Sequence, residues 1–273
     1  MSELTAIRDW RQAETALTAL LGLKRRPVGV RLLKTTADYA ASPALEPISG
    51  LPYCVAVEKA TAGRSYKMDI RHDRCAASAI AFGMMPVTEE RASGELHMGF
   101  GVYKDLNISH SVMDDMVYCE EENCGVEVRP LADCEKEPDI VLLILQPKAA
   151  MRLVQGYAYH FGQLKNIKMA GMCAICQEST SYPLARGQVN VSLLCSGTRC
   201  VGRWQDDELA VGIPVGQLRQ IIDGIWNTVD PMEAETDKRS IAARLREAGL
   251  EVPDINYKKN YYTASYRLPK VNE

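Results

Sequence analysis

Apolar and polar residues follow two different spacings along the chain. The run DIVLLILQP at 139–147 is apolar through its centre, which is typical of a central strand covered on both faces. In 4–22 and 215–227, apolar residues recur every three or four positions, a spacing that predicts helices with one buried side. The same criteria predict helices at 4–22, 52–62, 76–81, 148–162, 173–182, 215–227 and 237–248. They predict strands at 28–33, 65–70, 139–147, 189–194 and 208–213.

The order of these elements indicates the fold class. Helices alternate with strands, so we expect an α/β or α+β fold with a mixed sheet flanked by helices. Residues 86–137 combine acidic loops with one helical stretch, and we expect an irregular subdomain there. The Tyr-rich tail at 255–268 is expected to add an edge strand. Because the sequence has no internal repeat and no flexible linker, we predict a single domain over 1–273.

Composition and charge exclude several classes of function. The net charge is −3, and no basic face is evident that would bind nucleic acid. No apolar run reaches about 18 residues, so we expect no membrane-spanning helix. The first residues, MSELTAIRDW, lack the layout of a secretory signal. We therefore expect a cytoplasmic protein with reduced thiols.

Cysteine is the residue type that carries the most chemical information. The chain has nine, and an odd number does not suit a framework of paired disulfides. Cys173 and Cys176 form a C-x-x-C pair, which could bind a metal, act as a redox dithiol or simply pack in the core. The spacing of this pair alone does not decide among the three.

Three further cysteines stand where sites are commonly built. Cys195 follows the predicted strand VNVSLL, and Gly197 after it lets the backbone approach a bulky ligand. Arg199 could offset the negative charge of a thiolate centre or bind an anionic substrate. Cys54 and Cys75 each precede a predicted helix, where free N–H groups favour a thiolate. These placements favour a converging set of thiols.

Another group lies in the acidic loop YCEEENCG. Cys119 and Cys124 have C-x4-C spacing, and Cys134 follows. They could hold a second metal, but neighbouring glutamates raise the pKa of a thiol, so loop cysteines without a function are favoured. Zinc and an iron–sulfur cluster both accept four thiolates, and spacing does not separate them. We favour the iron–sulfur cluster.

Five segments carry a resemblance to a known family. They are KRRPVGVRLL (24–33), YCVAVEKATAGRSYKMD (53–69), RCAASAIAFG (74–83), ILQPKAAMRLVQGY (144–157) and CQESTSYPLARGQVNVSLLCSGTR (176–199). In this order they resemble the uncharacterised ArCR group, the domain-of-unknown-function family 169. The resemblance implies a cytoplasmic protein of prokaryotic anaerobic metabolism, with no settled activity.

The resemblance also selects four thiols. Cys54, Cys75, Cys176 and Cys195 occupy motif positions of the family, and four is the number that a cubane cluster needs. At 76–78 the chain has AAS where the family more often has Pro-Gly-Gly, which puts in doubt a backbone approach through that loop. The remaining cysteines would be available to a second centre: Cys119, Cys124, Cys134, Cys173 and Cys200.

The resulting hypothesis is a 4Fe-4S protein with those four motif thiols as ligands and with Asn190, Gly197 and Arg199 beside the cluster. It would transfer electrons, or act as a reductase on a small substrate, so its status as an enzyme stays open. We expect an electron-transfer protein or a small molecule as partner, no nucleic acid or membrane, and allow for a homo-oligomer.

Two alternatives stay open. One is a zinc- or metal-handling protein using Cys119, Cys124, Cys173 and Cys200, and the other is a thiol redox enzyme using the C-x-x-C pair.

Overall fold

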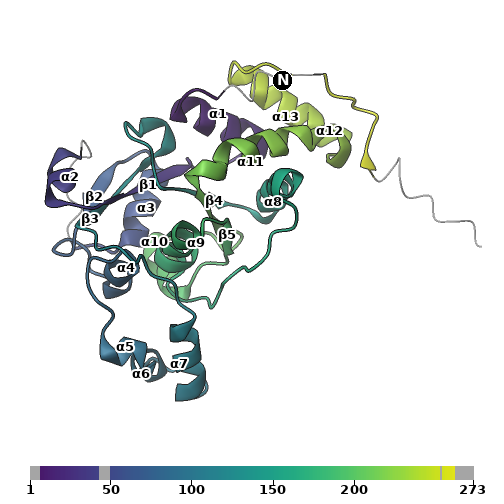
Figure 1. Ribbon diagram of the computed structural model, residues 1–273. Coiled ribbons are helices and arrows are strands. Elements are labelled where there is room, and N and C mark those ends of the chain that lie inside the picture. The colour runs from purple at the N-terminus through teal and green to yellow at the C-terminus, as the bar shows by residue number, and fades with distance from the viewer. Residues whose placement is uncertain (1–6, 43–49, 253, 262–273) are drawn as a thin grey trace, which may run out of the picture. The chain divides into compact units, whose positions relative to one another are not determined.

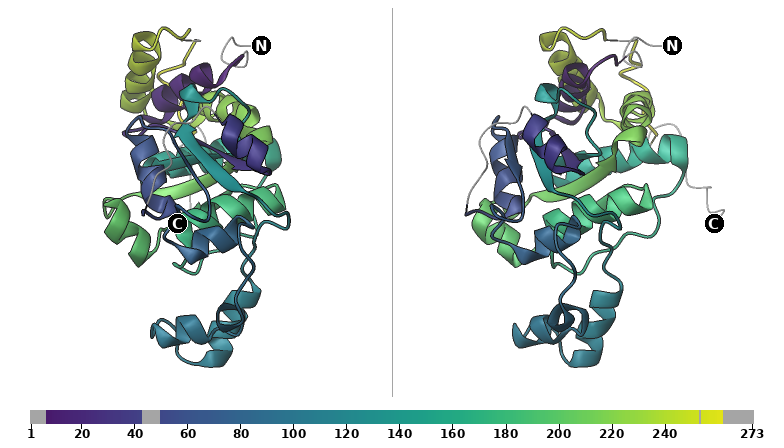
Figure 2. Two further views of the ribbon diagram at one scale, coloured as in Figure 1. Left: turned by 90° about the vertical axis from the view of Figure 1, so that its left-hand side faces the viewer. Right: turned by 60° about the vertical axis from the view of Figure 1, so that its left-hand side comes forward.

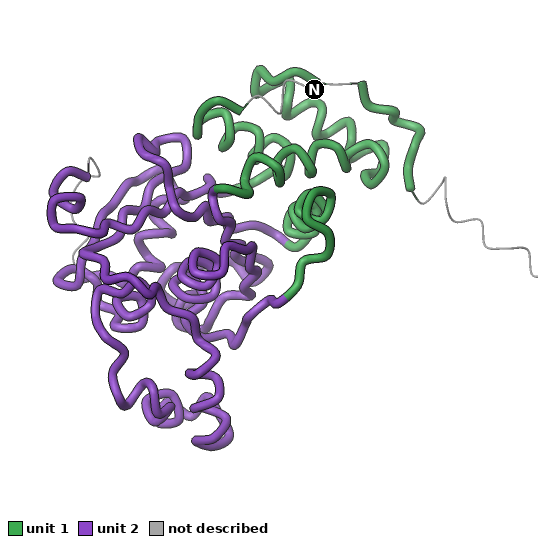
Figure 3. The backbone as a smooth tube through the Cα atoms, in the orientation of Figure 1, with its two compact units in different colours: residues 1–24, 147–165, 216–273 green, residues 25–146, 166–215 purple. Residues whose placement is uncertain are grey.

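The computed structural model describes residues 7–42, 50–252 and 254–261. The chain divides into two compact units (Figure 3). Unit 1 comprises 1–24, 147–165 and 216–273, and unit 2 comprises 25–146 and 166–215. The single domain expected over 1–273 stays a prediction.

Unit 2 is built around a sheet. Its described residues form six strands in the order β2-β3-β1-β4-β6-β5, and the paired strands all run antiparallel. The strands are β1 (Val28–Leu33), β2 (Tyr66–Met68), β3 (Gly125–Pro130), β4 (Ile140–Leu145), β5 (Asn190–Ser192) and β6 (Leu209–Pro214). The predicted fold class, a sheet flanked by helices, is confirmed in its α+β form, and where a mixed sheet was expected the described strand pairs are all antiparallel.

Strand β4 lies inside the sheet, as its continuous apolar run predicts. All six of its residues are buried, and Leu142 is paired with Val28 of β1 on one side and Gly212 of β6 on the other. Tyr53 and Val57 from a neighbouring helix belong to the same core as Leu142. The strand is therefore the hydrophobic centre on which unit 2 is assembled.

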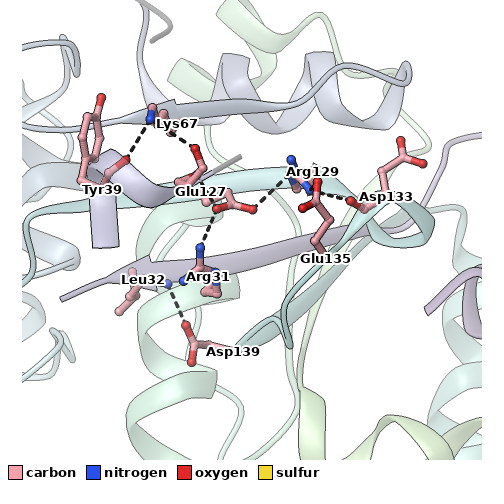
Figure 4. A network of polar contacts seen from close by, with 10 residues as sticks. Arg31, Leu32, Tyr39, Lys67, Glu127, Arg129, Asp133, Glu135 and Asp139 are labelled. Carbon is pink, nitrogen blue, oxygen red and sulfur yellow. Dashed lines mark hydrogen bonds and ion pairs between the residues drawn. The ribbon is translucent and has the colours of Figure 1, made fainter. Parts of the chain in front are cut away.

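Strand β3 lies within 86–137, where the sequence predicts irregular structure. Its sequence, GVEVRP, carries Glu127 and Arg129, and both side chains are buried. Arg31 Nη2 lies 2.7 Å from Glu127 Oε2, and Arg129 Nε lies 3.1 Å from Glu127 Oε1 (Figure 4). Arg129 also donates to the carbonyl of Asp133 at 2.7 Å. These contacts compensate charges that would otherwise be costly to bury.

The helices of unit 2 are α2 (Thr36–Ala41), α3 (Tyr53–Thr61), α4 (Ala76–Ala81), α5 (Glu89–Ala92), α6 (Glu95–Gly99), α7 (Leu106–Asp114), α9 (Tyr182–Arg186) and α10 (Ser196–Gly202), with the π-helix η3 (Ala174–Ser181) and the 3-10 turn η2 (Leu131–Asp133). Helices α3, α4, α9 and α10 lie close to the sheet, whereas α5, α6 and α7 lie apart from it (Figure 1). Helices α5, α6 and α7 pack against one another and form a small group at one end of the unit (Figure 2). The prediction of an irregular subdomain at 86–137 stays untested, although it covers both this group and the regular strand β3.

Unit 1 is helical in its described residues. Its helices are α1 (Trp10–Leu21), α8 (Pro147–Phe161), α11 (Val215–Asn227), α12 (Val229–Met232) and α13 (Glu235–Glu247). Arg152 of α8 forms a buried ion pair with Glu233 and donates to the carbonyl of Ile225 at 2.9 Å. The backbones of α8 and α11 touch at Gly156 and Gly224, where a side chain on either would overlap the other helix. These contacts hold the two helices together.

No helix in the described part of the chain has both the length and the apolarity needed to span a bilayer. Half of the edge strand expected at 255–268 falls outside the described residues, and the described half, 255–261, contains a turn and no strand.

Candidate functional site

Five cysteines line one cavity of about 480 Å³ in unit 2. Four of them are the predicted ligands Cys54, Cys75, Cys176 and Cys195, and the fifth is Cys173. Cys54 is the second residue of α3, Cys75 and Cys195 are the N-cap residues of α4 and α10, and Cys176 belongs to η3. The fold thus brings four separate segments of the chain to one place.

Helix starts hold three of these thiols, as the sequence predicts for Cys54 and Cys75. The N–H of Cys75 donates to Asp73 Oδ1 at 2.9 Å, which fixes the turn before α4. The sulfur of Cys195 accepts from the N–H of Thr198 at 3.4 Å, the position that a Ser or Asp side chain usually fills at an N-cap. An N–H group directed at sulfur stabilises a thiolate over a thiol.

The cavity thiols influence one another electrostatically. The pKa of Cys54 is raised to about 11, because burial and the neighbouring Cys75 and Cys195 raise it by more than a hydrogen bond with Thr198 lowers it. The pKa of Cys176 is raised by its hydrogen bond to Cys173, by burial and by the charges of Cys173, Cys75 and Cys54. Several thiolates side by side therefore oppose each other's ionisation unless a positive centre compensates them.

Cys173 has a different environment from the other four. A hydrogen bond from Cys176 lowers its pKa well below the usual value, against the effect of burial, and His97 and Arg91 lower it further. Nη1 of Arg91 lies 3.9 Å from its sulfur. Its backbone is left-handed (φ 52°), a conformation that costs a residue with a side chain roughly 1–2 kcal/mol. Cys173 is accordingly the thiol of this pair that carries a negative charge first.

The π-helix η3 places Cys176 in the cavity. All eight of its residues are buried, and π-helical turns are often found at functional sites. The side chain of Glu178 on η3 accepts from the N–H groups of Ala170 and Gly171 at 2.7 and 3.0 Å. The hydroxyl of Tyr53 lies 3.1 Å from Thr180 Oγ1 and joins η3 to α3. These bonds fix the segment that carries the C-x-x-C pair.

The three residues predicted beside the cluster lie in different positions. Gly197 lines the cavity, and a Cβ built on it would meet no atom within 4 Å. Arg199 donates to the carbonyls of Gln205, Leu193 and Glu208 at 2.7, 2.8 and 2.9 Å, and so fastens the loop around it. Asn190 donates to the carbonyls of Lys168 and Glu178 at 2.9 and 2.7 Å. The described contacts of Arg199 and Asn190 position backbone, and their role at a cluster stays a prediction.

The cysteines considered for a second centre are not brought together. Cys119 lines another cavity, of about 310 Å³, and burial with the nearby Asp139 and Glu121 raises its pKa to about 12. Cys134 donates to the carbonyl of Pro130 at 3.7 Å, Cys124 lies just before β3, and Cys200 is exposed on α10. All nine cysteines of the chain are described, and all are free thiols.

No cluster of His, Cys, Asp or Glu within the described ranges has three members placed to hold one metal ion. This finding covers the cavity thiols as well as the second group. A tetrahedral zinc ion with bonds of about 2.3 Å to sulfur needs its sulfurs about 3.8 Å apart. A cubane is less restrictive, because each thiolate binds a different corner of the cluster.

Arg91 and His97 are two cavity residues to which the sequence assigns no role. They lie on α5 and α6, line the cavity and are buried. Their surroundings in the sequence, TEERASGELHMG, are polar and read as a solvated surface. No local pattern marks them, since their burial follows from the packing of α5–α7 in unit 2.

Comparison with known proteins identifies a family and an uncharacterised archaeal relative. The model of the uncharacterised ArCR family (DUF169) matches residues 16–224, a range that contains every cysteine. The uncharacterized protein MJ0308 of Methanocaldococcus jannaschii is 28% identical over 152 residues, 55% of this chain. The match spans 65% of that protein, less than two thirds of its length. No solved structure matches the chain. Because the family match covers well over half of the sequence, the chain belongs to the uncharacterised ArCR family, as the resemblance of its five segments predicts.

Proposed function

We propose that unit 2 binds a 4Fe-4S cluster through the thiolates of Cys54, Cys75, Cys176 and Cys195. The observation that carries the proposal is the convergence of these four thiols, from four separate segments, on one cavity. Four thiolates around one cavity are the usual protein ligands of such a cluster.

The charges of the donor set support this proposal. Neighbouring thiols raise the pKa of Cys54 and of Cys176, so an empty cavity disfavours several thiolates at once. A cluster with positive iron centres removes that penalty, because metal binding is linked to the loss of thiol protons. The open space in front of Gly197 gives the backbone room to approach a ligand larger than one ion.

The wall of the cavity suits a small substrate beside the cluster. Leu96, Phe100, Met172 and Val201 contribute apolar surface, and the volume lies within the range of about 300–1,000 Å³ that is typical of small-molecule sites. When bound, the cluster supplies one-electron redox chemistry. The protein would exchange electrons with a redox protein, or reduce a small molecule held against the apolar wall.

The cell compartment follows from the same chemistry. Nine free cysteines suit a reducing environment, so we place the protein in the cytoplasm of an organism with anaerobic metabolism. An iron–sulfur cluster next to an open cavity would also be protected there from oxidation.

A second candidate function rests on the C-x-x-C pair. Cys173 has a lowered pKa and Cys176 a raised one, and the thiol of Cys176 donates to the carbonyl of Cys173 at 3.5 Å. Dithiol oxidoreductases use this asymmetry: the thiolate attacks a substrate disulfide, and the second thiol then displaces the reduced substrate thiol and closes the pair as a disulfide. The same cavity would then accept a disulfide substrate and hold no metal.

Metal and sulfide analysis of protein purified without oxygen tests the proposal. We expect about four iron atoms and four inorganic sulfides per chain, with broad visible absorbance that bleaches on reduction. Stoichiometric zinc without iron would overturn the cluster in favour of a zinc protein. A colourless, metal-free protein that forms a Cys173–Cys176 disulfide reversibly would select the second candidate.

A further inference from the structure

Arg91 is a buried cation without a carboxylate partner. Its side chain is 5% exposed, and within the described part of the chain no carboxylate lies within ion-pair distance of it. Two other arginines are buried to the same degree, and each has a partner: Arg129 pairs with Glu127, and Arg152 with Glu233. A buried charge needs a counter-charge, so the surroundings of Arg91 are incomplete.

Polar atoms around Arg91 also lack partners. Nε of Arg91, Nδ1 of His97 and the hydroxyl of Tyr103 are all buried and make no hydrogen bond to any described residue. Nε of Arg129 and Nε of Arg152 also make no hydrogen bond, but each forms an ion pair with a carboxylate, which Nε of Arg91 does not. His97 is only 1% exposed, and its ring lies 6.5 Å from that of Tyr103. Unpaired buried polar groups are rare in folded proteins, and three in one neighbourhood indicate a missing ligand.

The thiolate of Cys173 does not remove this deficit. It accepts a hydrogen bond from Nη1 of Arg91 at 3.9 Å, which occupies only one of the five N–H donors of the guanidinium. Nε of Arg91 and Nδ1 of His97 remain without partners in its presence. A second acceptor near these two side chains would satisfy them.

The rest of the cavity wall restricts the chemistry of that acceptor. Arg91 and His97 line the same cavity as Leu96, Phe100 and Val201, so a charged end and an apolar end lie in one space. The planar guanidinium of arginine matches the geometry of a carboxylate, which it can bind through two parallel hydrogen bonds.

We infer that the cavity binds a small carboxylic acid as its anion, with the carboxylate at Arg91 and His97 and an apolar body along Leu96, Phe100 and Val201. The inference rests on the proposed function in one respect: the bound acid would be the small molecule that meets the cluster. Binding of the acid is nevertheless measured separately from iron.

The test is calorimetric titration of the full chain, purified without oxygen, with acetate, butanoate and hexanoate. We expect saturable binding that strengthens with chain length, and no binding of hexan-1-ol or hexylamine at the same concentrations. Arg91→Gln should weaken binding of hexanoate by roughly 10- to 100-fold, the effect of losing a charged hydrogen-bonded pair. His97→Gln should weaken it less, and Arg186→Gln, which removes an exposed arginine of unit 2, should leave it unchanged.

Several results would overturn the inference. They are no saturable binding of any acid, equal binding of hexan-1-ol, sulfate binding as tightly as hexanoate, or full affinity in Arg91→Gln. If circular dichroism shows that Arg91→Gln does not fold, hexanoate binding by Arg91→Lys and by His97→Gln is measured in its place. Both replacements keep the approximate size of the side chain. Iron is measured on the same samples. Weakened binding with unchanged iron supports the subsite, whereas absent iron with intact acid binding counts against the cluster alone.

Discussion

Nη1 of Arg91 lies 3.9 Å from the sulfur of Cys173, and this contact connects the α5–α6 segment to the cavity thiols. The consequence is an asymmetric pair of neighbouring cysteines. Cys173 gains a cation and hydrogen bonds, while Cys176 is buried beside a negative charge. The cavity therefore holds Cys173, whose ionisation is favoured, beside Cys54 and Cys176, whose ionisation is disfavoured.

The reactivity of Cys173 should show this asymmetry in protein from which metal has been removed. Hydrogen bonding from Cys176, with the effects of His97 and Arg91, lowers its pKa well below the usual value, so its thiolate should persist to lower pH than that of an ordinary thiol. Burial raises the pKa of Cys54 to about 11 and of Cys119 to about 12, so their reactivity should still rise at alkaline pH. Peptide mass spectrometry after timed iodoacetamide treatment at a series of pH values measures all three.

Cys176→Ala serves as the comparison for that experiment, because alanine has no group that could donate to Cys173. Loss of the thiol that donates to Cys173 removes the largest contribution to the lowered pKa, so the pH profile of Cys173 should move upward. A Cys173 profile that is the same in this variant, or that follows those of Cys54 and Cys119, would contradict the assignment of the thiolate.

Single serine substitutions should separate the proposed ligands from the other thiols. Cys54→Ser, Cys75→Ser, Cys176→Ser and Cys195→Ser each remove one ligand, and we expect iron to fall to background in each. Cys173 lines the same cavity but does not occupy a motif position of the family. Cys173→Ser should therefore retain iron. Iron content by plasma mass spectrometry, on samples prepared side by side without oxygen, is the measurement.

Controls for the serine series come from outside the cavity. Cys134 contacts the carbonyl of Pro130, and Cys200 is exposed on α10, so serine at either position should leave iron unchanged. Equal loss of iron in Cys134→Ser would show that the series reports damage to the fold. Retention of iron in any of the four ligand variants, with loss in Cys173→Ser, would replace that ligand by Cys173.

Contact between α8 and α11 in unit 1 gives a test of packing. A Cβ on Gly224 would overlap the carbonyl oxygen of Gly156, and both helices would have to move apart. We expect Gly224→Ala to lower the free energy of unfolding by about 1–3 kcal/mol. Gly216→Ala in the same helix is the matched control, because its Cβ would meet nothing within 4 Å. It should be neutral or stabilising by up to about 1 kcal/mol. Urea denaturation followed by circular dichroism compares the two, and an equal loss in both would rule out the close contact.

Apolar patterning predicts most of the regular elements, and its failures have physical causes. Strand β4 and helices α8 and α11 are recognised because their burial is continuous or periodic in the sequence. Strand β3 is missed because Glu127 and Arg129 read as a solvated loop. Their charges are compensated by each other and by Arg31, a strand partner that lies about a hundred positions away and that local sequence cannot reveal.

In the candidate site, too, some residues can be predicted from local sequence and others cannot. Cys54 and Cys75 are found from their places at helix starts, and the four motif thiols together come from the resemblance to the family. Arg91 and His97 could not be found in this way, because α5 and α6 are short helices with a polar sequence. Their burial depends on tertiary packing within unit 2.

The buried ion pair between Arg152 and Glu233 should contribute to the stability of unit 1. Both side chains are buried in unit 1, and burial lowers the pKa of Arg152 without removing its charge at neutral pH. Glu233→Gln keeps the shape of the side chain but leaves that charge uncompensated, so the free energy of unfolding should fall by about 3–5 kcal/mol. The exposed pair Arg239–Glu235 on α13 is the matched control, and Glu235→Gln should cost about 0.5 kcal/mol or less. Urea denaturation of both variants at neutral pH measures the difference. Equal, small losses would mean that water reaches Arg152 and compensates its charge, and the buried pair would then contribute no more than a surface pair.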